Sequence, residues 1–251
     1  MKHIGIIGGL SPESTIEYYR IICREFNKKE GKLNFPQITI RSLNLQELLG
    51  SFGKNRWDEV AEKIGSAICD LEKAGAEFVA IAANTPHNAY DIIQQRSPIK
   101  VLSIMEATAD SIRQARLKKV GLLGTKATME YGFFQKAFQG RGIDTVVPEA
   151  AQRNYIDRTI WDKLSHGEIT REDRQKHKAI IKKLVNDGAE GVILGCTELP
   201  SLIKPEDSDV PLFDTTHIHA LTVLEYAMGK TEKTSQGGCD GRTKNNVFLR
   251  A

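Results

Sequence analysis

Cys196 is the residue of this chain whose type and position best suit proton-transfer chemistry. It lies in the run Gly195-Cys196-Thr197-Glu198, directly after the apolar residues 191–194, which are typical of a buried parallel strand. A thiol is a base when it is ionised and an acid when it is neutral. We expect a helix to begin just after Cys196, so that its N-terminus lowers the pKa of the thiol and favours thiolate. Thr197 and Glu198 are expected to orient the sulfur.

Short polar sequences follow four of the expected strands and suit a small anion. Glycines in them let the backbone approach a ligand, whereas hydroxyls and helix N-terminal amides favour carboxylate or phosphate. Ligands of open α/β sheets bind beyond the carboxyl ends of the strands. We therefore expect one small anion where the four sequences converge, at residues 8–11, 83–85, 124–128 and 195–198. The chain has neither a GxGxxG after its first strand nor a GxxxxGK[ST] motif, which disfavours nucleotide binding.

The apolar pattern predicts two copies of one βαβ-rich unit. Residues 4–9 and 120–125 match in type along their length, and 74 positions separate Gly9 from Ala83, against 71 between Thr125 and Cys196. Strands are expected at residues 4–7, 37–42, 77–83, 100–104, 120–123, 144–147 and 191–194. The first helix is expected to have Ser11 as its N-cap and to carry Tyr18, Tyr19, Ile22 and Phe26 on one face. Further helices are expected at residues 57–73, 107–114, 129–138 and 171–186.

These elements predict an α/β fold of two similar parallel-sheet halves, residues 1–115 and 116–228, with an N-terminal strand that both could share. If the halves face each other about a pseudo-twofold axis, the active site lies between them. Residues 229–251 are polar, glycine-rich and unpatterned, and are expected to form a mobile tail. Cys239 lies in that tail and is not expected to be catalytic.

The composition of the chain argues against several classes of binding partner and of site. The 35 basic and 32 acidic residues of the 251-residue chain are spread without a basic block, which disfavours nucleic acid and membrane surfaces as partners. The first apolar run is too short for a signal peptide or a membrane span, so a cytoplasmic protein is expected. The four cysteines show no CxxC spacing, and neither a disulfide framework nor a structural zinc site is expected.

Several other side chains are weaker candidates. His87, which follows Asn84-Thr85-Pro86, suits a supporting base and a helix cap equally well. His217 and His219 lack a third metal ligand, so capping or support is the better interpretation and no metal is predicted. Lys163 and Arg158 could bind a substrate carboxylate, although most helical lysines are simply solvated.

Taken together, the motifs resemble those of the aspartate/glutamate racemases over residues 1–228. The resemblance rests on residues 6–15 with Tyr18-Tyr19, on residues 84–87, on residues 121–125 with Thr128-Met129, and on residues 191–198. It implies two Rossmann-like halves, a homodimer, and a two-base mechanism in which two cysteines act on opposite faces of the α-carbon without a cofactor. It implies that the substrate is aspartate or, less readily, glutamate, and that the second cysteine is Cys196. The substrate-binding positions that follow from motif and resemblance are Leu10, Ser11, Asn84, Thr85, Thr125, Thr128, Thr197, Glu198 and, as the cationic group, Lys163.

Ala83 departs from the family pattern, because the first cysteine of the family stands directly before Asn-Thr and an alanine methyl neither gives nor takes a proton. Three interpretations stay open. Ala83 could be an engineered replacement of cysteine; it could be native, with water or His87 serving that face; or the reaction could need one thiol. The last would suit a decarboxylase similar to the arylmalonate decarboxylases, or an isomerase of a small diacid. Besides a racemase and a one-thiol decarboxylase or isomerase, the sequence leaves a third class of function open, a non-catalytic protein that binds a dicarboxylate.

Overall fold

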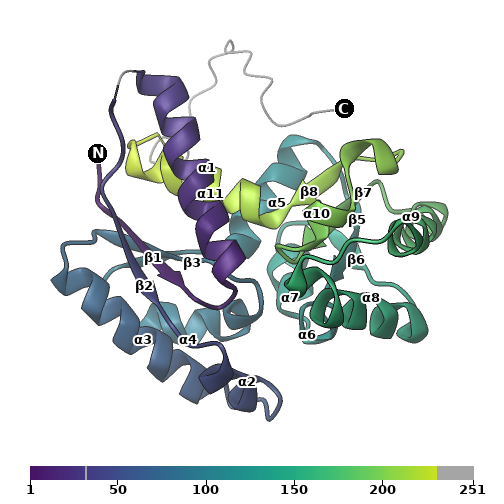
Figure 1. Cartoon of the computed structure of the whole chain (residues 1–251), viewed down its shortest axis with the longest axis horizontal. Helices are drawn as coiled ribbons and strands as arrows, with labels where there is room; N and C mark the ends of the chain where they lie inside the picture. The colour runs from purple at the N-terminus through teal and green to yellow at the C-terminus, as the bar shows by residue number, and fades with distance from the viewer. Residues whose placement is uncertain (32, 231–251) are drawn as a thin grey trace.

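The chain folds into two lobes that lie side by side, each built on a four-stranded parallel sheet (Figure 1). The structure is a computed structural model and describes residues 1–31 and 33–230. The first sheet has the strand order β2-β1-β3-β4 and the second has the order β6-β5-β7-β8. The strands are β1 (Ile4–Gly8), β2 (Ile38–Ser42), β3 (Phe78–Ile81), β4 (Lys100–Leu102), β5 (Lys119–Gly124), β6 (Asp144–Val146), β7 (Gly191–Gly195) and β8 (Leu212–Asp214).

The two sheets therefore repeat one topology, as the predicted duplication requires. β1 and β5 are equivalent central strands, and each pairs in parallel with the strand on either side. The predicted α/β class with two similar parallel-sheet halves is confirmed.

Helices connect and cover the strands. The helices are α1 (Pro12–Glu30), α2 (Gln46–Phe52), α3 (Trp57–Lys73), α4 (Tyr90–Arg96), α5 (Ile104–Gln114), α6 (Lys126–Glu130), α7 (Phe133–Gln139), α8 (Ala150–Asp162), α9 (Arg171–Asn186), α10 (Leu199–Leu202) and α11 (Thr215–Ala227). Within the described residues there are also three short 3-10 helices, η1 (Thr85–Ala89), η2 (Leu164–His166) and η3 (Pro205–Asp207). Among the described residues, no helix is both long and apolar enough to cross a membrane.

The two lobes exchange a helix at their junction. α5 follows the last strand of the first sheet, but Ile104, Met105 and Ile112 pack into the core of the second lobe. α11 follows the last strand of the second sheet, yet Val223 and Leu224 pack on the first sheet together with α1. Because burying apolar surface is the main force that holds such elements, each lobe needs a helix from the other to complete its core.

Local sequence signals explain α1 and correct one expectation about it. Ser11 is the N-cap and accepts a hydrogen bond from the Ser14 backbone, with Pro12 in the first turn, as predicted. Tyr19 was expected on the buried face, but it is 50% exposed, whereas Ile21 is only 7% exposed. A helix turns by 100° per residue, so the face that carries Tyr18 continues at positions 21 and 22.

The helix expected at residues 129–138 is in fact two helices. Gly132 has φ +76°, a left-handed conformation that ends α6 and starts α7. The expected helices at residues 57–73 and 171–186 match α3 and α9. The sequence analysis did not predict α2, α8 or α11. Of the predicted mobile tail, residues 229–251, the part from residue 231 onward, with Cys239, lies outside the described residues.

Gly9 offers a test of the turn after β1. Gly9 and Gly132 share φ +76°, but a Cβ on Gly9 would lie 2.0 Å from the Leu43 carbonyl oxygen, whereas one on Gly132 would meet nothing within 4 Å. We expect Gly132→Ala to lower the free energy of unfolding by about 1 kcal/mol through backbone strain alone, and Gly9→Ala by about 3 kcal/mol because the clash adds to it. Urea denaturation measures both, and equal losses would contradict the tight packing of this turn.

Candidate active site

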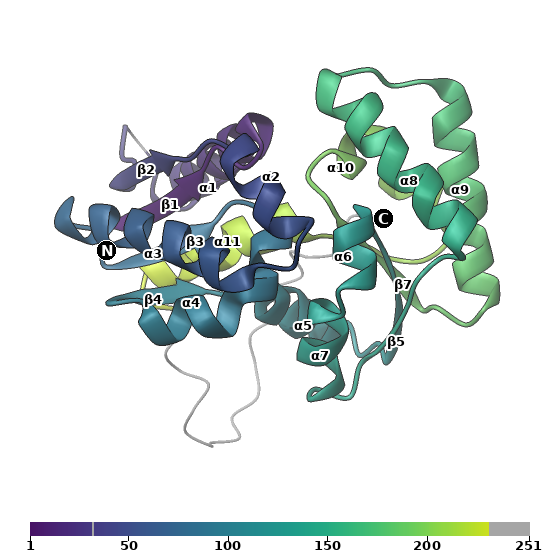
Figure 2. The same ribbon diagram turned by 90° about the horizontal axis from the view of Figure 1, so that it is seen from below.

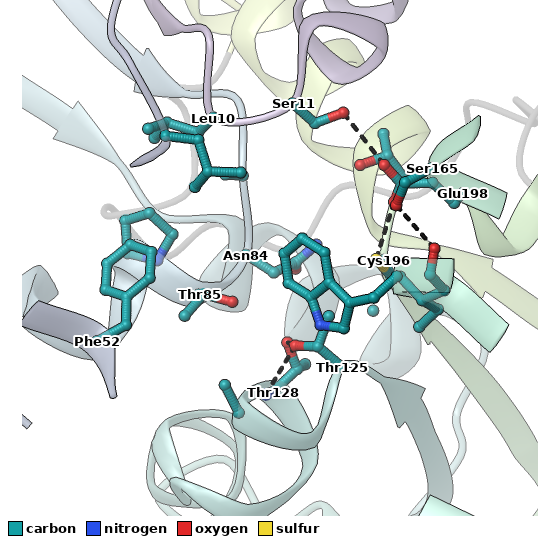
Figure 3. A pocket seen from close by; sticks show the side chains of 18 of the residues that line it. Leu10, Ser11, Phe52, Asn84, Thr85, Thr125, Thr128, Ser165, Cys196 and Glu198 are labelled. Carbon is teal, nitrogen blue, oxygen red and sulfur yellow. Dashed lines mark hydrogen bonds between the residues drawn. The ribbon is translucent and has the colours of Figure 1, made fainter. Parts of the chain in front are cut away.

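A cavity of about 490 Å³ lies between the lobes, at the ends of β1, β3, β5 and β7 (Figure 3). It is the convergence of strand ends that the sequence predicts. Of the predicted site residues, ten line it and Lys163 does not. The ten are Leu10, Ser11, Ala83, Asn84, Thr85, Thr125, Thr128, Cys196, Thr197 and Glu198.

Glu198 joins the thiol of one lobe to the hydroxyl of the other. The Cys196 thiol donates a hydrogen bond to Glu198 Oε2 at 2.9 Å, and Ser11 Oγ donates to Glu198 Oε1 at 3.1 Å (Figure 3). Both oxygens of the carboxylate are therefore occupied, one by each lobe. The arrangement fixes the sulfur at the cavity wall and gives its proton a basic acceptor at hydrogen-bond distance.

The pKa of the Cys196 thiol is raised well above its usual value, which corrects the expectation of a stabilised thiolate. Burial is the main cause, and the negative charge and hydrogen bond of Glu198 act in the same direction. The backbone amides of Thr197 and Glu198 lower the pKa but are outweighed. The predicted helix is α10, which has four residues and begins only at Leu199, so its N-terminus is a weak counterweight. The resting thiol is therefore neutral.

Asn84 lines the cavity and keeps one buried acceptor unpaired. Its Nδ2 donates to Thr215 Oγ1 at 3.2 Å, and Thr215 Oγ1 donates in turn to the Leu194 carbonyl oxygen at 3.0 Å. This chain fixes the amide orientation, and Asn84 Oδ1 is left buried without a hydrogen-bond partner among the described residues. Since buried polar atoms are nearly always paired, a ligand with an N–H or O–H donor suits this position.

His87 supports the Ala83 segment from behind and is not among the residues that line the cavity. The Ala83 carbonyl oxygen lies 2.8 Å from His87 Nδ1, and the Ile104 backbone N–H donates to Nε2 at 3.3 Å. Nδ1 therefore carries the proton and donates it to Ala83. Burial lowers the pKa of His87 to about 4, so the ring is neutral. With both nitrogens engaged, His87 holds this segment in place and does not serve as the proton donor that the sequence analysis considered.

The other two candidate histidines belong to α11. His219 is buried between Tyr18 OH, 2.8 Å from its Nδ1, and the Leu102 carbonyl oxygen, 3.1 Å from its Nε2. His217 is exposed, and its backbone N–H donates to the N-cap Asp214. No group of three or more His, Cys, Asp or Glu side chains within residues 1–31 and 33–230 is arranged to hold a metal ion.

The two hydroxyls of the second lobe form a cap that mirrors Ser11. Thr125 is the N-cap of α6 and accepts from the Thr128 backbone N–H at 3.3 Å, and the two hydroxyl oxygens lie 3.1 Å apart (Figure 3). Thr125 is 7% exposed and Thr128 is 1% exposed. Their hydroxyls and nearby amides are neutral donors suited to a carboxylate.

Lys163 is held away from the cavity, which corrects its predicted role as the cation for a substrate carboxylate. Its ammonium nitrogen lies 2.8 Å from Asp173 Oδ2, and Asp173 is almost fully buried. Because removing one partner would leave a buried charge unpaired, this ion pair is a structural contact between α8 and α9. Arg158 also does not line the cavity.

The sequence analysis missed an apolar wall of the site, and it also missed the polar lining residues Glu13, Asp157 and Ser165. To this wall, α2 contributes Leu49 and Phe52, its N-cap position contributes Leu45, and α8 contributes Ile160 and Trp161. The sequence does carry a signal for α2, because residues 45, 48, 49 and 52 are apolar at the i, i+3, i+4, i+7 spacing of one helical face. Figure 2 shows α2 and α8 on different lobes.

Comparison with known proteins agrees with this geometry. The family model Asp/Glu/Hydantoin racemase matches residues 7–223. The broad specificity amino-acid racemase RacX of Bacillus subtilis is 26% identical over 223 residues, which cover 85% of this chain and 92% of the relative. The glutamate racemase of Limosilactobacillus reuteri is 27% identical over 190 residues, covering 73% of this chain and 68% of the relative.

A solved structure is also similar to this chain. An aspartate racemase homologue from Pyrococcus horikoshii has 37% sequence identity and a TM-score of 0.80, and the match covers 91% of this chain and all of the other. The family predicted from the motifs is thus confirmed. Because the family model spans most of its length, this chain belongs to the Asp/Glu/hydantoin racemase family.

Proposed function

We propose that this chain is an amino-acid racemase that moves the α-proton of its substrate through the thiol of Cys196, without pyridoxal phosphate or metal. The observation that carries the proposal is the hydrogen-bonded set Cys196–Glu198–Ser11 at the wall of a cavity between two duplicated lobes. The family description points to an acidic amino acid, aspartate first and glutamate second, but the proposed reaction at the α-carbon does not depend on which side chain the substrate carries.

The substrate's polar groups have matching partners in the cavity. Asn84 Oδ1 lacks a donor, which suits the α-ammonium group. The hydroxyls of Thr85, Thr125 and Thr197 line the same cavity and suit the α-carboxylate. Negative charge that develops on this carboxylate when the α-proton leaves would be stabilised by such preorganised donors.

Glu198 supplies the base that the neutral thiol needs. In the proposed step the proton of Cys196 moves to Glu198 Oε2, and the resulting thiolate takes the α-proton from the face that it contacts. Return of that proton from the thiol regenerates the original enantiomer. Inversion needs a proton from the other face, where Ala83 offers only a methyl group, so that solvent water would have to supply it. The proposal therefore implies faster α-proton exchange than racemisation.

Ala83 and the neutral thiol also favour a second candidate function, the decarboxylation of a substituted malonate. Loss of carbon dioxide would leave an enediolate, and the protonated Cys196 would deliver one proton to it, so that one thiol suffices. Carbon dioxide release from a substituted malonate, with none of the exchange described below, would favour this reaction. Aspartate binding by calorimetry without exchange or carbon dioxide release would favour a non-catalytic binder.

Replacing the thiol tests the central assignment. We expect Cys196→Ala to reduce α-deuterium incorporation into the substrate in deuterated water at least ~100-fold, because the proton carrier is gone. Proton NMR of an amino-acid panel that includes L-aspartate and L-glutamate measures it. Cys69→Ala is the matched control, since Cys69 belongs to α3 and does not line the cavity. Unchanged exchange in Cys196→Ala would rule out the proposed role.

Restoring a thiol at position 83 tests the assignment of the two faces. We expect Ala83→Cys to raise the rate of racemisation about 100-fold, while α-deuterium exchange of the faster enantiomer changes much less. Chiral chromatography measures the racemisation. Ala83→Ser has similar size but a much weaker acid, and should stay near the parent rate. If Ala83→Cys leaves racemisation unchanged, the two faces are assigned wrongly.

Neutralising the carboxylate tests the contact between Glu198 and the sulfur. Glu198→Gln removes a negative charge that disfavours the thiolate, so we expect the pKa of Cys196 to fall. Because the base is also lost, α-proton exchange at neutral pH should fall as well. Ultraviolet absorbance of the thiolate against pH, with Cys196→Ala as baseline, gives the pKa. An increase in that pKa would mean that Glu198 does not act on the thiol through its charge.

A further inference from the structure

The cavity has acidic but no basic side chains. Of the described residues that line it, Glu13, Asp157 and Glu198 carry carboxyl groups, and none is lysine, arginine or histidine. The cation that the sequence predicted, Lys163, is bound to Asp173 instead. A substrate with a second carboxylate would therefore place it among like charges without a cationic partner.

Glu198 and Asp157 are partly buried, whereas Glu13 is exposed, so the first two make this arrangement costly for a dicarboxylate. Glu198 lies in the wall beside the sulfur, and Asp157 Oδ1 accepts from the Lys126 backbone N–H at 2.7 Å. A charged group that leaves water needs a partner of opposite sign. The neutral donors at the strand ends can bind one carboxylate. Every amino acid carries an α-carboxylate, which would occupy these donors and leave none for a second carboxylate.

The rest of the cavity offers apolar contact. Leu45, Leu49 and Phe52 from the first lobe and Ile160 and Trp161 from the second are lining residues. The Phe52 ring stacks on Trp57 with centroids 5.8 Å apart, and Trp57 meets Tyr131 of the second lobe edge-on at 5.4 Å. These contacts support the wall from behind, and Figure 3 shows Phe52 across the site from Glu198.

We infer that this site selects amino acids with an uncharged, apolar side chain of about the size of leucine over aspartate and glutamate. The inference rests on the proposed function for the reaction and differs from it in the substrate. It follows from the apolar wall of α2 and α8, the absence of a lining cation and the three lining carboxyl groups. The α-ammonium group meets Asn84 Oδ1, and the side chain extends toward Leu49 and Phe52.

Three substrates of similar shape test the inference. L-aspartate, L-asparagine and L-leucine branch at the same carbon but carry a charged, a polar and an apolar end. Calorimetry gives the affinity of the full chain for each, and NMR in deuterated water gives the exchange rate. We expect leucine to exceed aspartate at least tenfold in affinity and in exchange efficiency, with asparagine between them. Aspartate equal to or better than leucine, or no binding by any of the three, would overturn the inference.

A designed cation provides a second, independent test. Leu49 is partly buried in the wall, so Leu49→Arg places a positive charge there. We expect its affinity for aspartate to rise about tenfold over the parent, whereas Leu49→Gln, which is polar but uncharged, should show no rise. An equal effect of both variants would mean that charge does not set the preference. If leucine binds better than aspartate but no amino acid exchanges its α-proton, the proposed function fails while the substrate inference stands.

Discussion

The contact between the neutral thiol of Cys196 and Glu198 determines what the rest of the site can do. A thiol held in a partly buried wall beside a carboxylate keeps its proton, so in the proposed reaction it would become a base only after Glu198 accepts that proton. Ser11 donates to the same carboxylate from the other lobe. A change in the spacing of the lobes would therefore alter the chemistry of the sulfur directly.

The exchange of α5 and α11 keeps that spacing fixed. Each lobe buries a helix that follows the last strand of the other sheet, so neither core is complete alone. α11 begins at Thr215, whose hydroxyl joins Asn84 of the first lobe to the β7 backbone of the second. The packing that closes the two cores thus also sets the orientation of the Asn84 amide. On the opposite side of the same segment, neutral His87 holds the Ala83 carbonyl.

The polar donors of the cavity repeat between the two lobes, whereas its apolar wall does not. The donors that face the ligand come from strand ends and helix caps and repeat between the lobes, as Ser11 and Thr125 show. The apolar wall that α2 and α8 contribute does not repeat in this way. Conserving the reaction while varying the wall is a general route by which one fold serves several substrates.

The sequence by itself determined the family, the doubled α/β architecture and most residues at the strand ends, because these depend on local runs of apolar residues and on glycine and cap positions that are contiguous in the chain. It also placed Cys196 and exposed the departure at Ala83. Tertiary structure alone decided the pKa of Cys196, because burial and the Glu198 carboxylate outweigh the backbone amides that the local sequence displays. It removed Lys163 by pairing it with Asp173 and brought Leu49 and Trp161, which stand 112 positions apart in the sequence, into one wall. Leu49 and Trp161 belong to different lobes, and no local pattern encodes which side chains of the two lobes meet in the cavity.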